Sequence, residues 1–314
     1  MDALPTPGEP SRSLLEAIDS FRKGNVSHTP VSRLSDLSRA EVRTLTEDWL
    51  SIPVEHRERL VRRFDELSEE RVDVNFRRAL RVALEDPEPV IRQLAIVGLW
   101  EDVSTDLLER LQDFMHGDPS PDVRAEAARA LERFSVLAVS GALDQSDANA
   151  LRESLQRAVD GDETPHGVQR RALESLGPFG AEPEIASIIS EVYESGDHGL
   201  QCSAVYAMGR SLQPRWLPMV LAELESDDSE LRYEAVRAAA ALEASDAIPA
   251  LLEAARDDDA EIRYAAISAV GQIGGRGSVR ALERLSEDAG DADRELIEAA
   301  MDDVNALLDP FPTS

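Results

Sequence analysis

The chain has 314 residues and a formal net charge of −29, with 33 basic and 62 acidic side chains. Such a charge repels phosphate backbones and anionic membranes, so we expect neither bulk nucleic-acid binding nor membrane attachment. Apolar residues make up 42% of the chain but aromatic residues only 4%, and the prominence of Ala and Leu favours helices.

Cysteine and histidine are sparse. The single cysteine, Cys202, excludes an internal disulfide framework, and the five histidines show no spacing typical of metal ligands. We therefore expect no cofactor and no metal site. The first ten residues do not combine a cationic segment with an apolar run, and no stretch approaches the roughly 18 consecutive apolar residues of a membrane span. A cytoplasmic location is expected.

The N-terminal part, residues 1–35, has the composition of a mobile segment. Residues 1–10 and 24–32 are rich in Pro, Gly and Ser. Between them, the stretch from Ser13 to Glu16 fits a capping box, in which a hydroxyl accepts from a backbone amide and a Glu reaches back. One short helix is therefore expected in this segment.

Residues 36–70 are expected to form an N-terminal capping hairpin. A second capping box runs from Ser38 to Glu41. The apolar pattern that follows predicts one helix at about 39–51 and another at about 54–69.

One pattern recurs over residues 71–308. An aliphatic residue precedes an Arg or Gln, here termed the marker, and small or apolar residues follow three, four and seven positions later, as in Ile262-Arg263, Ala266-Ile267 and Val270. These offsets place the apolar residues on one face of an α-helix. A second amphipathic helix lies between successive markers, so each period predicts a helical hairpin that must stack on its neighbours. The markers lie at positions 92, 124, 169, 201, 232, 263 and 294.

The spacing of the markers is nearly constant. Successive intervals are 32, 45, 32, 31, 31 and 31 residues. The long interval contains residues 139–149, a stretch with Gly, Ser and Asp that we interpret as an inserted loop or an extended helix end.

The rhythm of an Asp followed by [VI]-R-x-x-A-[AVI]-x-x-[AG]-[LV]-G resembles HEAT repeats, in particular the short bacterial repeats related to phycobilisome lyases. The resemblance implies an all-α fold, an α-α superhelix: a HEAT-like solenoid of about seven helical hairpins plus N-terminal capping helices. It also implies that the second helices line a concave face. Such repeats serve many unrelated roles, so the resemblance predicts the fold rather than the function.

The residues suited to catalysis have simpler structural interpretations. Acidic clusters such as Asp257-Asp258-Asp259 stand at helix starts, where carboxylates stabilise the helix N-terminus. Cys202 follows His198 by four residues, a pairing able to lower a thiol pKa, but nothing else resembles a catalytic triad. We therefore predict that the protein is not an enzyme.

The marker arginines are expected to be structural. Planar bidentate pairing suits a recurring contact between Arg and Asp. We expect each marker Arg to bond an acid or a carbonyl group in its own or the next repeat, which would form an inter-repeat ladder.

A different helix face carries the candidate binding residues. Positions one and five after each marker lie away from the apolar stripe, and three of the four tyrosines fall there. Tyr and Arg are enriched at binding hot spots, although packing of each ring against the next repeat is an alternative. The predicted partner-binding residues are Arg129, Arg170, Arg171, Tyr206, Arg210, Tyr233, Arg237 and Tyr264.

These observations favour a non-catalytic scaffold or adaptor whose concave groove receives a protein partner. A tetrapyrrole-lyase-like subunit or chaperone is the alternative that the resemblance implies. A HEAT-like DNA glycosylase is disfavoured, because residues 87–314 carry 19 basic and 45 acidic side chains. The predicted partner is therefore a protein, with no nucleic acid and no membrane.

Overall fold

The computed structural model describes residues 11–288 and 290–308, and the regular structure in these residues is entirely helical. The chain forms two compact units that divide between Arg133 and Phe134. Helix α9 (Glu132–Val139) contains this division. The predicted all-α fold is confirmed. The expected mobility of residues 1–10 lies outside the described residues.

The first unit is built from eight α-helices and one 3₁₀ turn before α9, within the described residues. They are α1 (Arg12–Arg22), α2 (His28–Ser32), α3 (Arg39–Asp48), η1 (Trp49–Ser51), α4 (Val54–Glu70), α5 (Arg77–Ala83), α6 (Pro89–Gly98), α7 (Thr105–Gly117) and α8 (Pro121–Ala130).

The second unit contains the helices that follow α9. Its elements are α10 (Gln145–Asp160), α11 (His166–Leu176), η2 (Gly177–Phe179), α12 (Pro183–Glu194), α13 (His198–Arg210), η3 (Pro214–Trp216), α14 (Leu217–Glu223), α15 (Ser229–Ala241), η4 (Ser245–Ala247), α16 (Ile248–Ala254), α17 (Ala260–Ile273), α18 (Gly275–Asp288) and α19 (Asp291–Leu308).

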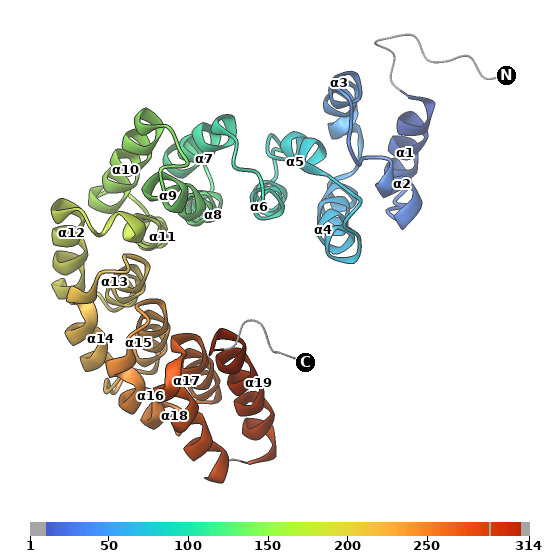
Figure 1. The fold of residues 1–314 in the computed structure, drawn as a ribbon. Coiled ribbons are helices and arrows are strands. Elements are labelled where there is room, and N and C mark those ends of the chain that lie inside the picture. Colours follow the sequence, from blue (N-terminus) through green and yellow to red (C-terminus); the bar gives the residue numbers. More distant parts are fainter. Residues whose placement is uncertain (1–10, 289, 309–314) are drawn as a thin grey trace. The chain divides into compact units, whose positions relative to one another are not determined.

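Each unit consists of two layers of helices. In the second unit α10 packs on α11, α12 on α13, α14 on α15, α16 on α17 and α18 on α19, so the second helix of each hairpin carries the marker. The marker helices α11, α13, α15, α17 and α19 also contact one another in sequence and form the inner layer of the arc that Figure 1 shows for this unit. Together with α5/α6 and α7/α8 in the first unit, these are the seven expected hairpins.

Serine side chains cap the N-termini of α1 and α3. Ser38 and Glu41 form the expected capping box of α3. Helix α1 differs from the prediction, because its N-cap is Ser11 rather than Ser13. The Ser11 hydroxyl accepts from the Leu14 amide at 3.3 Å and donates to the Glu41 carboxylate at 2.6 Å, which ties α1 to α3.

Two of the marker arginines, Arg92 and Arg232, form the rungs of the expected inter-repeat ladder. Arg92 donates to both carboxylate oxygens of Asp118 in the next repeat, at 2.8 and 2.7 Å, and to the Asp86 carbonyl oxygen at 2.8 Å. Arg232 repeats this arrangement with Asp257, at 2.7 and 3.1 Å. Arg124 and Arg263 donate to main-chain carbonyl oxygens of their own repeats. Arg92 and Arg232 therefore connect their hairpins to the next repeat, whereas Arg124 and Arg263 stabilise their own repeats.

The ladder starts one hairpin earlier than the sequence pattern indicated. Arg57 on α4 donates to both oxygens of Asp86, at 2.7 and 3.2 Å, and to the Ile52 carbonyl oxygen at 2.7 Å. Trp49 also donates to Asp86, at 2.6 Å. The apolar residues three, four and seven positions after Arg57 fit the repeat pattern, but His56 replaces the aliphatic residue before the marker.

The long interval between markers contains one additional helix. Helix α9 and the turn that follows it separate α8 from α10, and Gly141 adopts the left-handed region with φ of 75°. The turn covers residues 140–144, whereas residues 145–149 already belong to α10, so the insertion predicted at residues 139–149 overlaps the additional residues only in part.

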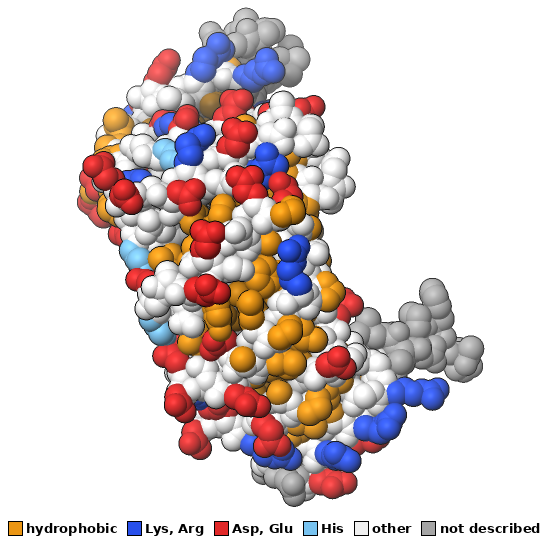
Figure 2. Space-filling view, turned by 90° about the vertical axis from the view of Figure 1, so that its left-hand side faces the viewer, with side chains coloured by type: hydrophobic (Ala, Val, Ile, Leu, Met, Phe, Trp, Pro, Cys, Tyr) orange, Lys and Arg blue, Asp and Glu red, His pale blue; other side chains and the backbone are white. Residues whose placement is uncertain are grey.

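The outer helices of the second unit expose some apolar surface. Figure 2 shows hydrophobic side chains gathered over α12, α14 and α16, with acidic side chains around them. Partly exposed residues of these helices include Ile188, Leu217, Leu221, Ile248 and Leu252. Among the described residues, none of the helices combines the length and the apolar character needed to cross a membrane.

Candidate functional site

The predicted binding residues of the second unit all lie on marker helices. Arg170 and Arg171 are on α11, Tyr206 and Arg210 on α13, Tyr233 and Arg237 on α15, and Tyr264 on α17. The remaining residue, Arg129, lies on α8 in the first unit. We call Tyr206, Tyr233, Arg237 and Tyr264 the tyrosine surface.

The centre of the tyrosine surface is a guanidinium between two rings. The Arg237 Cζ atom lies 5.0 Å from the ring centroid of Tyr206 and 5.7 Å from that of Tyr233. Each cation–π contact of this kind stabilises by about 0.5–1 kcal/mol at an exposed position. Both rings are half-buried, and they come from neighbouring repeats. The cluster therefore joins α13 to α15 and holds these three side chains in place.

Tyr264 continues this surface onto α17. Its side chain is exposed, and the Arg263 Cζ atom lies 5.9 Å from its ring centroid. The fourth tyrosine, Tyr193, lies apart on the outer helix α12 and donates a hydrogen bond to Glu223, and burial raises its pKa to about 12.

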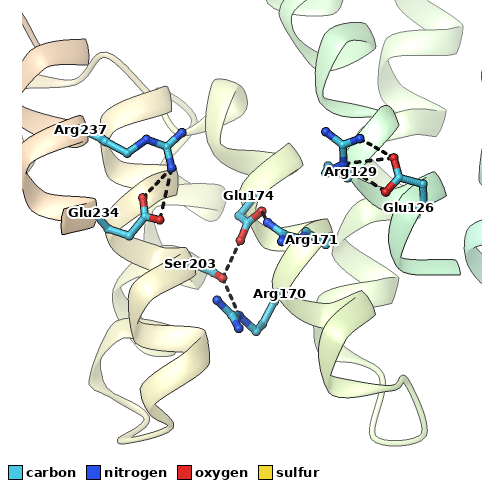
Figure 3. Close-up of polar contacts among 8 residues, drawn as sticks. All are labelled: Glu126, Arg129, Arg170, Arg171, Glu174, Ser203, Glu234 and Arg237. Carbon is cyan, nitrogen blue, oxygen red and sulfur yellow. Dashed lines mark hydrogen bonds and ion pairs between the residues drawn. The ribbon is translucent and has the colours of Figure 1, made fainter. Parts of the chain in front are cut away.

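Nearby carboxylates neutralise several of the candidate arginines. Arg237 bonds Glu234 at 3.1 Å, and Arg129 bonds Glu126 at 2.5 Å, in each case one turn apart on the same helix (Figure 3). Burial raises the pKa of the Glu234 carboxyl group. Each of these two ion pairs offsets the positive charge of its arginine.

Arg170 and Arg171 converge on one buried glutamate. The Arg170 Nε atom donates to the Ser203 hydroxyl at 3.1 Å, and this hydroxyl donates to Glu174 at 2.8 Å (Figure 3). Arg171 bonds the other oxygen of Glu174 at 2.6 Å. These bonds connect α11 to α13, so Arg170 has a structural role in addition to any contact with a partner.

Two small cavities adjoin the tyrosine surface. One, of about 120 Å³, is lined by Tyr206, Gly209, Arg210, Arg237, Ala238 and Ala241. The other, of about 190 Å³, is lined by Arg170, Cys202, Ser229, Glu230, Tyr233, Glu234, Asp259, Glu261 and Ile262. Both are smaller than the roughly 300–1,000 Å³ typical of small-molecule sites and match the size of single side chains or ions.

A cluster beside the larger of these two cavities was only partly anticipated. His198 and Cys202 lie one turn apart on α13, with the His198 Nε2 atom 3.9 Å from the Cys202 Sγ atom. The next repeat adds Asp228, whose carboxylate lies 2.9 Å from Nε2, and Glu230, whose carboxylate lies 3.9 Å from Nδ1. Glu230 was missed, because its approach depends on how α15 stacks on α13.

The surroundings of Cys202 raise the pKa of its thiol instead of lowering it, in line with the structural interpretation of this residue. Burial raises the pKa of the Cys202 thiol to about 11, and Glu230 and Asp228 add to the shift. The thiol is therefore not activated as a nucleophile. The hydrogen bond with Asp228 raises the pKa of the His198 imidazole.

The first unit has a separate hollow of about 750 Å³. Its lining includes Phe64 and Phe76, whose rings stack at 4.7 Å, and the exposed side chains of Val72 and Trp100. No predicted binding residue lines it.

Comparison with known proteins agrees with this architecture. Residues 78–165 and 217–302, more than half of the chain, match the family model described as HEAT repeats. No curated protein matches the sequence.

Several solved structures of low sequence identity are similar to the chain. The complex of CpcE and CpcF of phycocyanin lyase from Nostoc sp. PCC7120 is 19% identical, with 97% of this chain and 99% of that chain covered and a TM-score of 0.51. The Escherichia coli protein YibA is 14% identical over 97% of this chain and 99% of that chain, with a TM-score of 0.43. Human deoxyhypusine hydroxylase is 15% identical over 93% of this chain and 97% of that chain, with a TM-score of 0.35.

Proposed function

The chain belongs to the HEAT-repeat family, and we propose that it is a non-catalytic scaffold that holds a protein partner on the inner layer of its second unit. The observation that carries the proposal is the tyrosine surface. Its guanidinium and rings come from successive repeats and remain partly or largely exposed. Aromatic and Arg side chains held in this way lose little conformational freedom when a partner binds.

The chemistry of the surroundings supports a partner with basic side chains. Glu234, Asp259 and Glu261 line the cavity next to Tyr233, and residues 87–314 have a large excess of acidic side chains. A field of this sign accelerates association with a basic segment and weakens as salt is added. We therefore expect the partner to contribute a segment that combines basic and apolar residues.

The test uses a double variant, Tyr233→Ala with Tyr264→Ala. Affinity capture with the wild-type full chain and mass spectrometry first supply candidate partners, and each is then purified and titrated. A true partner should bind the double variant about 30-fold more weakly, which corresponds to about 2 kcal/mol. Tyr193→Ala is the matched control, since it removes the same ring from the outer layer and should leave the affinity unchanged.

Stability measurements separate binding from packing. Tyr264 is exposed and Tyr233 half-buried, so we expect the double variant to lose about 1 kcal/mol of unfolding free energy. A variant that melts early while its folded fraction binds normally would show that the rings serve inter-repeat packing. Equal loss of affinity in Tyr193→Ala would also count against the proposed surface.

A tetrapyrrole-lyase-like subunit is the second candidate function. The hollow of about 750 Å³ in the first unit is within the size range of ligand pockets, and it is lined by Phe64, Phe76 and Trp100. A change in bilin absorbance on adding the protein, abolished by Trp100→Ala, would favour this function. An unchanged spectrum would count against it.

A further inference from the structure

Four metal-binding side chains meet between α13 and α15 in neighbouring repeats. One ligand atom each from His198, Cys202 and Glu230 lies within 4.8 Å of the other two. Asp228 approaches the same imidazole, with its Oδ2 atom 2.9 Å from the His198 Nε2 atom. Nitrogen and sulfur atoms bound to one tetrahedral zinc ion lie about 3.5 Å apart, given bond lengths of about 2.0 and 2.3 Å. His198 Nε2 and Cys202 Sγ lie 3.9 Å apart, so a small side-chain movement would bring them to this separation.

The preceding repeat contains the same contact between a histidine and an aspartate, but without the other two donors. There, His166 Nε2 also lies 2.9 Å from the carboxylate of Asp197, so the His–Asp contact is a repeated structural bond. Four residues after His166 stands Arg170, and two residues after Asp197 stands Gly199. The later repeat has Cys202 and Glu230 at these two places, which converts a simple bridge into a set of four donors.

The surroundings favour a cation and give it access. Asp228, Glu230 and Glu234 all act electrostatically on the Cys202 thiol, and Arg170 acts in the opposite direction. Cys202 and Glu230 line the cavity of about 190 Å³, which has room for an ion and a water ligand. The Glu230 side chain is 69% exposed and is therefore free to close the remaining distance.

We propose that His198, Cys202 and Glu230, with Asp228 as a fourth donor, bind a divalent transition-metal ion of the zinc type between two repeats. Thiolate, imidazole and carboxylate together are a ligand set for zinc rather than for calcium or magnesium. The ion would clamp α13 to α15. The inference does not depend on the proposed scaffold function, because the site is formed within this chain.

Cobalt(II) titration of the purified full chain, freed of metal beforehand, tests the site. Cobalt bound to a thiolate gives a ligand-to-metal charge-transfer band, and we expect this band to saturate at one ion per chain and to be displaced by zinc. Cys202→Ser should abolish the band, and Glu230→Gln should weaken binding at least about tenfold. Because the Glu230 side chain is exposed, we expect Glu230→Gln to fold like the wild type, and circular dichroism would verify its helix content.

His166→Gln provides the matched control. It breaks the equivalent His–Asp contact one repeat earlier without touching any proposed ligand, so its cobalt affinity should equal that of the wild type. Zinc should also raise the melting temperature of the wild type and of His166→Gln, but not that of Cys202→Ser. Absence of the band in the wild type, its survival in Cys202→Ser, or equal loss in His166→Gln would each overturn the proposal.

Discussion

Individual ion pairs in this chain differ greatly in what they contribute. The side chains of Arg92 and Asp118 are only 8% and 3% exposed, whereas those of Arg12 and Glu16 are 92% and 66% exposed. Removing one partner of a buried pair leaves an uncompensated charge, so Asp118→Ala should cost about 3–5 kcal/mol of unfolding free energy. Glu16→Ala should cost under about 0.5 kcal/mol. Urea denaturation of both variants checks the contrast, and similar losses would contradict the structural role of the ladder.

The ladder also predicts a specific response to acid. The hydrogen bonds from Arg232 lower the pKa of Asp257 below its ordinary value. A carboxyl group whose pKa is lower in the folded state stabilises the fold fully above its unfolded pKa of roughly 3.9, and this stabilisation is lost as the pH falls through the folded value.

The destabilisation caused by Asp257→Asn should therefore be clear at neutral pH and shrink as the pH falls below about 4. Denaturant unfolding of the wild type and of Asp257→Asn, at neutral pH and below about pH 4, measures the difference in unfolding free energy. If the loss of unfolding free energy caused by Asp257→Asn stays constant or grows in acid, the charge of Asp257 is not the source of the stabilisation.

The residue contacts were predictable where one helix or one repeat period determines them. The bonding of the marker arginines followed from their spacing, and the i, i+3 spacing of Glu234 and Arg237 would have revealed that pair as well. The approach of Glu230 to His198 was not predictable, because it depends on the rotation and offset of α15 against α13. A repeat period gives the order of helices but not these two parameters.

At the level of the helices, close packing between marker helices restricts side-chain size. A Cβ atom on Gly209 would lie 2.7 Å from the Ala238 Cα atom, closer than real Cβ contacts allow. Gly209→Ala must therefore push α13 away from α15, and we expect a loss of about 1–3 kcal/mol of unfolding free energy.

A second helical glycine provides the control for this prediction. Nothing lies within 4 Å of a Cβ atom added to Gly167 on α11, so Gly167→Ala should be neutral or stabilise by up to about 1 kcal/mol. Denaturant midpoints of both variants give the comparison. A harmless Gly209→Ala would mean that the two helices can separate at little cost.

At the level of the whole molecule, the periodic pattern predicted seven hairpins but not the division at Arg133 and Phe134. That division falls where α9 interrupts the period, and the sequence showed only an interval that was too long. The sequence placed the insertion at residues 139–149, whereas the additional helix α9 spans Glu132–Val139, and the effect of this helix on compactness depends on contacts that periodicity does not describe.

Stacked repeats interact mainly with their neighbours, so damage should stay local. Gly209→Ala loosens the contact between α13 and α15, and hydrogen–deuterium exchange should accelerate most in these two helices and next in α11 and α17. Helices α4 and α6 belong to the first unit, which does not contain the altered contact, so their exchange rates should not change. Mass spectrometry of peptides from both units measures the pattern. Uniform acceleration in α4, α6, α13 and α15 would show instead that the chain unfolds as one cooperative body.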